Sequence, residues 1–446
     1  MERKAFIFNT NKCVACMACV AGCSIENGTS AGMNWRTVNT FNNIRHPELP
    51  VFHFSLACNH CSDALCMTNC PSLAYTRDKE TGVIIHHAEA CIGCKYCTWA
   101  CPYDAPKFNA TSGIIEKCNF CLERINDEIA PACVSACPVG ALEYESDDLP
   151  DENLVIPGFV NKGIRPSIRI VPIREENKTP KIMNTDSVEL SIEESIKVQA
   201  LPKSKVELAK EWILVFFTLS AAILVAWFGS HLAKGIPLNI FWFLPLGLIS
   251  LILSSVHLGK KLRAWRSILN IRRSWLSREI LFYSVFLGSG SLYLITGNPI
   301  LGYISIISGF FALVSIDMVY HVFDRRDKIP LHSAMIWSSG FLIFAYLTGV
   351  PSLFGFIILL KTGLYIYRKI IYIKLHTKLL IVPTIIRIIS LMVPLVLIFY
   401  LFELLWWVIP VVFMVGEIID RSEFYHEAEV NTPELALHEL HKKSAK

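Results

Sequence analysis

The cysteines constrain this chain more than any other feature, because all sixteen lie within its first 137 residues. They form four groups of four, and each group begins with Cys-x2-Cys and ends with Cys-x3-Cys. A proline directly follows the last cysteine of the second, third and fourth groups. The groups are Cys13, Cys16, Cys19 and Cys23; Cys58, Cys61, Cys66 and Cys70; Cys91, Cys94, Cys97 and Cys101; and Cys118, Cys121, Cys133 and Cys137.

Three kinds of cysteine chemistry compete for this pattern. Disulfides need an oxidising compartment, and the first ten residues contain Arg3 and Lys4 but no apolar segment that would serve as an export signal. Zinc sites usually take their ligands from separated pairs rather than from triplets. The first and third groups have the spacing of bacterial ferredoxins, whose fourth cysteine binds the neighbouring cluster. We therefore expect all sixteen cysteines to bind iron, in four 4Fe-4S clusters.

The exchange of the fourth ligand means that the clusters come in pairs. Spacing alone leaves the partners open, because neighbouring groups could pair, or the first group could pair with the fourth around the second and third. In either arrangement, we expect residues 1–145 to form an α+β double ferredoxin-like iron–sulfur domain.

From Trp212 onward, apolar stretches follow one another that are long enough to cross a membrane, which takes about 20 helical residues. The chain is 53% hydrophobic and only 18% charged, which argues against a purely soluble protein. We predict an all-α eight-helix transmembrane bundle in residues 211–425, after a polar linker or strap (146–210) and before a polar tail (426–446). The predicted spans are 212–230, 238–257, 280–296, 300–320, 334–350, 352–368, 383–401 and 404–420.

The orientation of the bundle follows from its loop charges, since an even number of spans leaves both ends on one side. The loops on that side are rich in Lys and Arg, including Lys260, Arg272 and Arg325, whereas the opposite loops contain Lys234 alone. The positive-inside rule therefore predicts a multi-pass protein of the bacterial inner membrane with its cysteine domain on the cytoplasmic face. The net charge of +4 is too small to suggest a nucleic-acid partner.

Four ionisable residues are expected at the face of the bundle that lies on the side of the N-terminus: His257, Glu279, Asp317 and His321. Ionisable groups at membrane depth are costly and usually functional. Oxidation of a quinol releases two electrons and two protons, and a histidine–carboxylate group beside an iron–sulfur domain could receive both. The alternative is that these residues contact lipid headgroups or the docked cysteine domain.

Two cations are predicted to lie deeper in the bundle. For Lys361 and Arg387 a proton path is conceivable, but snorkelling or pairing with Glu403 or Glu417 is the commoner explanation. We expect no haem, because no histidine falls in the middle of a predicted span.

Three stretches of the cysteine region are distinctive: Cys-Ile-Gly-Cys-Lys-Tyr-Cys-Thr-Trp-Ala-Cys-Pro from Cys91, Lys-Cys-Asn-Phe-Cys-Leu-Glu-Arg from Lys117, and Pro-Ala-Cys-Val-Ser-Ala-Cys-Pro from Pro131. They resemble the four-cluster electron-transfer subunits of the dimethyl sulfoxide reductase family of molybdoenzymes. In that family the pairing of the groups is nested: the first group pairs with the fourth, and the second group pairs with the third. The resemblance thus implies four ligand sets: Cys13, Cys16, Cys19 and Cys137; Cys23, Cys118, Cys121 and Cys133; Cys58, Cys61, Cys66 and Cys101; and Cys70, Cys91, Cys94 and Cys97. Because Cys94 is present, it implies four cubanes and no 3Fe cluster.

The apolar half carries a second resemblance. Ser255-Val-His-Leu-Gly-Lys-Lys-Leu-Arg-Ala-Trp265 and Gly416-Glu-Ile-Ile-Asp-Arg-Ser-Glu-Phe-Tyr425 are similar to the eight-helix quinol-oxidising anchor subunit of the same family, which also implicates His257. The chain therefore looks like a fusion of two subunits that are usually separate.

Together the resemblances imply an electron-transfer and anchor subunit that oxidises menaquinol or ubiquinol from the membrane pool. The electrons would pass through the clusters to a partner subunit that carries a molybdopterin site. Two alternatives remain: electrons flow from a substrate-oxidising partner to quinone, or the bundle is a redox-driven proton-translocating module. Without its partner the chain would be redox-active but would lack the partner's substrate activity.

Overall fold

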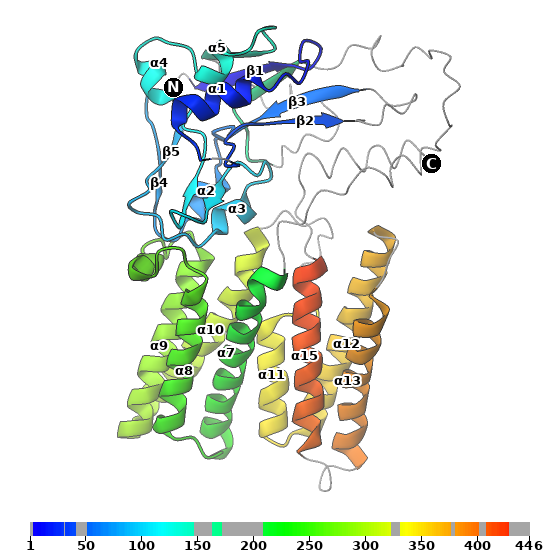
Figure 1. Cartoon of the computed structure of the whole chain (residues 1–446). Helices are drawn as coiled ribbons and strands as arrows, with labels where there is room; N and C mark the ends of the chain where they lie inside the picture. The colour runs from blue at the N-terminus through cyan, green and yellow to red at the C-terminus, as the bar shows by residue number, and fades with distance from the viewer. Residues whose placement is uncertain are drawn as a thin grey trace, which may run out of the picture. The chain divides into compact units, whose positions relative to one another are not determined.

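The computed structural model describes residues 3–30, 32–41, 51–146, 163–171, 208–322, 331–375, 380–400 and 407–427. The chain divides into two compact units (Figure 1). One comprises Met1–Lys203 with Val430–Lys446, and the other comprises Ser204–Glu429. The first contains short strands and helices, whereas the second is helical throughout its described part.

A three-stranded sheet brings together distant parts of the first unit. Its central strand is β1 (Lys4–Asn9), which pairs with β8 (Leu142–Ser146) antiparallel and with β9 (Ile168–Val171) parallel. Alternate residues of a strand face one side, so Phe6 and Phe8 both enter the core that holds many of the cysteines. Strand β9 comes from the segment predicted as a linker or strap, and residues 147–162 and 172–207 of that segment lie outside the described residues.

The remaining strands form three antiparallel hairpins, and five short helices lie among them. The hairpins are β2 (Thr37–Phe41) with β3 (Phe52–Leu56), β4 (Tyr75–Arg77) with β5 (Ile84–His86), and β6 (Lys107–Asn109) with β7 (Ile114–Glu116). The helices are α1 (Ala18–Asn27), α2 (Leu65–Thr68), α3 (Tyr96–Ala100), α4 (Leu122–Asn126) and α5 (Ala132–Ser135). Every one of these helices contains a cysteine or directly follows one, so the helices position the thiols.

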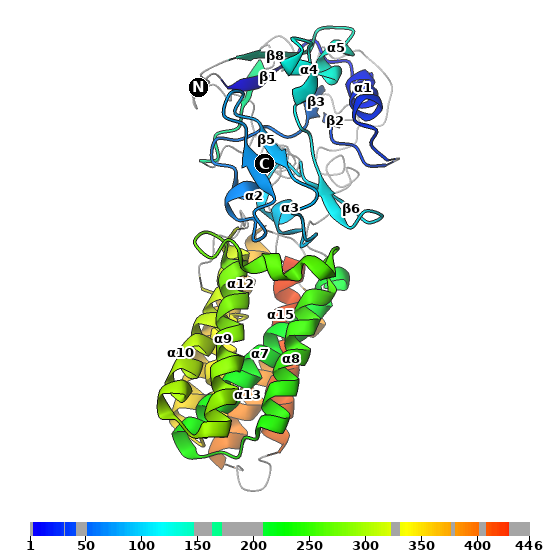
Figure 2. The ribbon, with the colours of Figure 1, turned by 90° about the vertical axis from the view of Figure 1, so that its left-hand side faces the viewer.

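In the second unit a helix occupies each of the eight predicted positions. The helices are α7 (Leu208–Lys234), α8 (Ile240–Val256), α9 (Trp275–Thr296), α10 (Pro299–Val319), α11 (Ile336–Leu347), α12 (Pro351–Leu375), α13 (Ile381–Tyr400) and α15 (Val408–Glu427). A 3-10 helix, η3 (Lys261–Ile268), crosses the end of the bundle between α8 and α9 (Figure 2). The last predicted span is displaced, because α15 continues to Glu427 rather than ending at residue 420.

Fewer helices meet the requirements for a membrane span than predicted. Within the described residues, four helices are long and apolar enough to cross a membrane, or five if α8 and η3, bent by 104°, form one span. The 12-residue α11 is too short, and α12 and α15 carry charged residues in their middle turns. The structure thus supports a multi-pass membrane protein, and the number of eight spans remains a prediction.

Local sequence explains the sharp turn between α9 and α10. Gly297 ends α9 with a φ of 68°, a conformation that only glycine adopts freely. The Asn298 side chain accepts a hydrogen bond from the Ile300 amide, and Pro299 occupies the first turn, where its missing N–H costs nothing. Because α9 and α10 are antiparallel, the C-terminal end of α10 returns to the end of the bundle where α9 begins.

Candidate functional site: cysteine loops and a buried charge network

The four cysteine groups share one local backbone conformation. In each group, the residue before the second cysteine has a positive φ: Ala15 (56°), His60 (43°), Gly93 (69°) and Phe120 (61°). Such angles are unusual for residues with a side chain. Their recurrence in four loops of different sequence indicates that tertiary packing imposes a common, tightly curled path.

The curled loops direct backbone amides at sulfur. The Gly93 amide donates to Cys91 Sγ at 3.4 Å, and the Phe120 amide donates to Cys118 Sγ at 3.3 Å. Hydrogen bonds to cluster sulfurs are among the factors that set the reduction potential of an iron–sulfur centre. The cysteine loops therefore offer both thiol ligands and amide donors.

The Cys-Pro segments form a second recurring turn. In all three, the residue two positions after the proline has a positive φ; these residues are Leu73, Asp104 and Gly140. In two of the turns the following amide donates to the cysteine sulfur, from Ala74 to Cys70 (3.4 Å) and from Ala141 to Cys137 (3.3 Å). In these two turns the proline after the cysteine therefore belongs to a turn that folds an N–H back onto the thiol.

The first and fourth groups lie together in the folded chain. Cys13 is within electrostatic reach of Cys19, Cys137 and Cys16. Burial and the neighbouring thiolate of Cys133 raise the pKa of Cys23 to about 12. Asn27 Nδ2 lies 3.9 Å from Cys23 Sγ and 4.0 Å from Cys121 Sγ, so one side chain links thiols that are 98 positions apart in sequence.

The second and third groups lie together in the same way. Cys61 is within electrostatic reach of Cys101, Cys58 and Cys66. Cys94 is within reach of Cys70 and Cys91, and Cys97 of Cys94 and Cys70. These neighbourhoods are the ones that the nested arrangement predicts.

The donor set suits 4Fe-4S clusters. All sixteen cysteines are free of disulfides, and burial raises the pKa of the Cys66, Cys94 and Cys118 thiols, so they need a metal centre to be held as thiolates. In the described part of the chain, no three His, Cys, Asp or Glu side chains are placed to bind one metal ion. A cubane does not require this, because each of its irons binds a different thiolate.

In the helical unit, the structure brings two of the predicted quinol-site residues together. The Asp317 carboxylate accepts hydrogen bonds from the amides of Ile336 (3.0 Å) and Trp337 (3.2 Å), and thereby caps the N-terminus of α11. Arg421 Nη1 lies 3.5 Å from Asp317 Oδ1. Glu279 is buried, and Arg421 and Asp317 are the charged groups that act on it.

The two predicted histidines are placed less specifically. His257 directly follows the last residue of α8 and is half-buried, while His321 is exposed in the turn after α10. Since α8 and α10 end where α9 begins, all four predicted residues lie at the same end of the bundle (Figure 1). Arg421 links Glu279 and Asp317 within this group.

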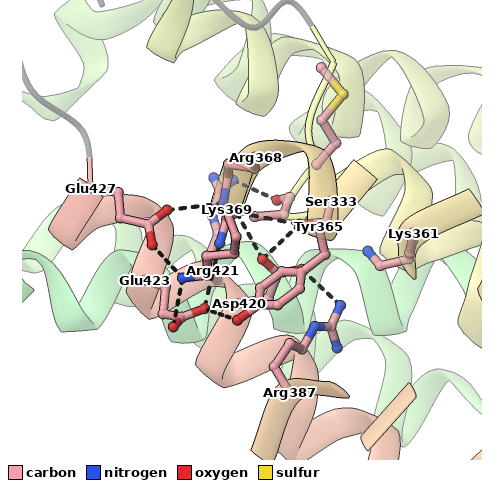
Figure 3. Close-up of polar contacts among 12 residues, drawn as sticks. Ser333, Lys361, Tyr365, Arg368, Lys369, Arg387, Asp420, Arg421, Glu423 and Glu427 are labelled. Atoms are coloured by element: carbon pink, nitrogen blue, oxygen red, sulfur yellow. Dashed lines mark hydrogen bonds and ion pairs between the residues drawn. The ribbon is translucent and has the colours of Figure 1, made fainter. Parts of the chain in front are cut away.

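The deeper cations belong to a buried charge network of α12, α13 and α15 (Figure 3). Lys361 Nζ lies 3.0 Å from Glu417 Oε2, and Arg387 Nη2 lies 2.9 Å from Glu417 and 2.8 Å from Asp420. Arg368 lies 2.8 Å from Asp420. The predicted pairing with Glu417 is therefore confirmed, whereas Glu403 lies outside the described residues.

The network continues along α15 toward the end of the bundle where the predicted quinol-site residues lie. Lys369 pairs with Glu423 (2.8 Å) and with Glu427, and Tyr365 donates a hydrogen bond to Glu423 at 2.7 Å. With the Arg421–Asp317 pair, the ion pairs within the described bundle join five buried cations and five buried carboxylates, and Glu279 is a sixth buried carboxylate. The paired cations and carboxylates balance one another, which compensates much of the cost of removing them from water.

Sequence reasoning missed most of this network. Asp420, Arg421 and Glu423 lie in the Gly416–Tyr425 stretch, but the resemblance of that stretch to the anchor subunit predicts no partner for them. The available signal was the spacing of charges three or four residues apart in an otherwise apolar helix, from Glu417 to Glu427. Such spacing places charges on one face, and so predicts a charged partner helix.

The described part of the bundle also contains an apolar cavity of about 660 Å³ between α7, α10 and α11. Its lining includes Ile307, Phe310, Leu313 and Trp337. Leu313 lies one helical turn before Asp317 on α10. The apolar cavity therefore extends toward the helix turn that carries the Asp317 carboxylate.

Comparison with known proteins gives independent matches for the two units. A family model described as a 4Fe-4S dicluster domain matches residues 49–147, and one described as the DMSO reductase anchor subunit (DmsC) matches residues 208–400. One of the polypeptides of the anaerobic dimethyl sulfoxide reductase of Haemophilus influenzae is 33% identical over 157 residues, which cover 33% of this chain and 76% of the relative. A sulfite dehydrogenase subunit of Allochromatium vinosum is 33% identical over 177 residues, which cover 35% of this chain and 74% of the relative. The corresponding polypeptide of the anaerobic dimethyl sulfoxide reductase of Escherichia coli is 32% identical over 147 residues, which cover 31% of this chain and 71% of the relative.

Fold, cysteine loops and anchor helices together define an iron–sulfur electron-transfer protein with its own membrane anchor. This protein belongs to the family of dimethyl sulfoxide reductase iron–sulfur subunits, and it carries the anchor domain of such enzymes in the same polypeptide. The predicted fusion is thereby confirmed.

Proposed function

We propose that the first unit holds four 4Fe-4S clusters in the nested ligand sets. The sets are Cys13, Cys16, Cys19 and Cys137; Cys23, Cys118, Cys121 and Cys133; Cys58, Cys61, Cys66 and Cys101; and Cys70, Cys91, Cys94 and Cys97. The proximity of Cys13 to Cys137 and of Cys61 to Cys101 supports this arrangement. When bound, such clusters accept and release one electron at a time.

At the bundle end that carries Glu279 and Asp317, the chain oxidises a quinol, menaquinol or ubiquinol, to the quinone. The reaction gives two electrons, which leave singly through the iron–sulfur domain, and two protons, which need bases. His257, His321 and Glu279 are the candidate bases, and Asp317 is the further carboxylate of the site. The observation that carries the proposal is the Glu279–Arg421–Asp317 group: two carboxylates share one cation, so a proton can be taken up without leaving an unbalanced charge.

The partner is a catalytic subunit with a molybdopterin site, because the relatives are named as parts of dimethyl sulfoxide reductases. The excess of Lys and Arg in the loops on the N-terminal side supports a cytoplasmic iron–sulfur domain. One relative is named a sulfite dehydrogenase subunit, and this favours a second candidate function, in which a substrate-oxidising partner delivers electrons through the clusters to quinone.

Anaerobic purification of the full-length protein tests the clusters, since four cubanes require about sixteen irons and sixteen sulfides per polypeptide. A preparation with zinc and no sulfide would refute them. A menaquinol analogue should then reduce the clusters of the wild type, as seen by EPR spectroscopy.

The Glu279→Gln variant tests the quinol site. It should lose most of the quinol-dependent reduction, while dithionite still reduces all clusters. The Glu26→Gln variant alters a surface ion pair with Arg124 and serves as the control. Undiminished quinol-dependent reduction in Glu279→Gln would remove this residue from the site. The midpoint potentials of the clusters relative to the quinone couple decide the direction of flow.

A further inference from the structure

Arg36 is a fully buried cation beside the cysteines of the first and fourth groups. It lies directly before β2 and is 2% exposed. Its guanidinium stacks 4.5 Å from the centre of the Phe6 ring, and its Nη1 donates a hydrogen bond to Ser55 Oγ at 3.0 Å. Both contacts hold the guanidinium plane in one orientation.

Two nitrogens of this guanidinium have no acceptor in the described part of the protein. Nε and Nη2 of Arg36 are both buried and without a hydrogen-bond partner there. Leaving buried charged donors unsatisfied is expensive, so an acceptor is expected in the filled site. The groups around Arg36 are thiols rather than carboxylates: Cys133, Cys118, Cys19 and Cys23.

These four cysteines divide between two of the proposed ligand sets. Cys23, Cys118 and Cys133 belong to one set, whereas Cys19 belongs to the set completed by Cys137. Burial acts to lower the pKa of Arg36, but the surrounding thiolates outweigh it, so the pKa is raised and the side chain stays charged.

Ser55 connects Arg36 to the ligand set that contains Cys19. Its Oγ lies 3.5 Å from Cys19 Sγ. A cysteine that binds iron is a thiolate and has no proton to give. The Ser55 hydroxyl therefore donates to Cys19 and accepts from Arg36, which forms a polarised chain from the guanidinium to the Cys19 sulfur.

We propose that Arg36 is a positioning residue that raises the reduction potentials of two clusters. It acts directly on the cluster bound by Cys23, Cys118, Cys121 and Cys133. It acts through Ser55 on the cluster bound by Cys13, Cys16, Cys19 and Cys137. The Nε and Nη2 groups of Arg36 would supply hydrogen-bond donors to the cluster held by Cys23, Cys118, Cys121 and Cys133. This inference rests on the proposed presence of the clusters.

The physical reason is the change of charge on reduction. Each cluster gains one electron, so its reduced form is more negative by one charge. A buried cation with N–H donors stabilises the more negative form more strongly, because charge-assisted hydrogen bonds are strong where water is excluded. Removing the cation should therefore lower the potential.

The test is a potentiometric EPR titration of the intact, anaerobically purified protein. Arg36→Met keeps much of the side-chain length and removes the charge and the donors, and it should lower two of the four midpoint potentials. For the directly contacted cluster we expect at least a tenfold change in the reduced-to-oxidised ratio, which is 59 mV for a one-electron couple. Ser55→Ala should lower only one of those two potentials.

Two further variants serve as controls. Arg36→Lys retains the charge and should restore most of the potential of the directly contacted cluster. Arg165→Met removes a cation from a half-exposed surface pair with Asp63, where water screens the charge, and should move no potential.

Iron and sulfide analysis distinguishes failure of the proposed four clusters from failure of the proposed role of Arg36. If the wild type lacks four clusters, the proposed function fails before Arg36 is tested. If Arg36→Met retains the iron and sulfide of the wild type and all four potentials are unchanged, the role of Arg36 is refuted. If Arg36→Met does not assemble its clusters, the midpoint potentials of Arg36→Lys and Ser55→Ala test the proposal instead. Unchanged potentials in Ser55→Ala would refute the polarised chain from Arg36 to Cys19.

Discussion

Asp420 balances two arginines at once in the interior of the bundle. Its carboxylate lies 2.8 Å from both Arg368 and Arg387 and accepts a hydrogen bond from Ser333 at 2.9 Å. Removing one partner of a buried ion pair leaves a charge without compensation, which costs about 3–5 kcal/mol. A single side chain of α15 thus connects α12 and α13.

We expect Asp420→Asn to destabilise the protein by about 3–5 kcal/mol. Thermal unfolding of the detergent-purified protein measures the effect. The matched control is Glu26→Gln, which breaks a surface ion pair and should cost about 0–1 kcal/mol. Equal stability of the two variants would contradict a structural role for the network.

His86 introduces a pH dependence into the iron–sulfur domain. Burial, with smaller contributions from Lys117 and His87, lowers its pKa from the usual 6.5 to about 4. The unfolded protein therefore binds a proton at a higher pH than the folded protein, so this residue reduces stability as the pH falls from about 6.5 toward 4. His86→Gln lacks this titration, and its thermal stability should fall less than that of the wild type between pH 7 and pH 5. Parallel pH profiles for the two proteins would show that His86 does not contribute.

At the scale of elements, α13 and α15 approach each other at a glycine. A Cβ on Gly416 would overlap Ser390 and lie 2.7 Å from Arg387 Nη1. The absence of a side chain at Gly416 thus lets α15 bring Glu417 and Asp420 to Arg387. This is a packing reason for a glycine inside a helix that otherwise favours larger residues.

Gly416→Ala should therefore destabilise the bundle, by about 1–3 kcal/mol for overpacking, although alanine is the better helix former. Thermal unfolding in detergent checks this. Gly288→Ala on α9 is the control, because nothing lies within 4 Å of its added Cβ, and we expect it to be neutral or stabilising. A stabilised Gly416→Ala variant would show that α13 and α15 can accommodate a methyl group at this position.

If the proposed quinol site near Asp317 is correct, the apolar cavity between α7, α10 and α11 should hold the isoprenoid tail of the quinol. Ile307 lines it and is 56% exposed, so Ile307→Trp can fill the cavity without disturbing the core. We expect a several-fold higher KM for a long-tailed quinol and an unchanged KM for a quinol without a tail. Ile300→Trp, on the same helix but outside the lining, is the control. The same KM change for both quinols would contradict binding of the tail in the cavity.

At the scale of the whole molecule, the loops determine the orientation in the membrane. Lys234, the last residue of α7, and Lys261, the first residue of η3, are both exposed and lie at opposite ends of the bundle. If the loops rich in Lys and Arg are cytoplasmic, a membrane-impermeant thiol reagent should label Lys234→Cys in intact cells. Lys261→Cys should be labelled only after the cells are opened. The reverse pattern would place the iron–sulfur domain outside.

Much of the iron–sulfur site could be predicted from sequence, because thiol spacing reports local loops that have to surround a cluster. The selection of the sixteen cysteines as candidate ligands follows from such short-range patterns. The nearness of Cys13 to Cys137 does not, since it depends on β1 and β8 pairing across most of the domain. Arg36 had no signal at all, because only the packing of β2 and β3 brings it to Ser55 and the thiols.

For the bundle, hydrophobic stretches of suitable length predicted where helices occur, since the cost of burying backbone polar groups acts on each segment separately. Sequence could not decide which carboxylate neutralises which cation, because an ion pair depends on the rotation and depth of two helices at once. Lys361 therefore had two candidate partners, and the structure shows the ion pair between Lys361 on α12 and Glu417 on α15. What the sequence alone determined is the chemistry that each segment carries; what the tertiary structure decided is which of those groups meet.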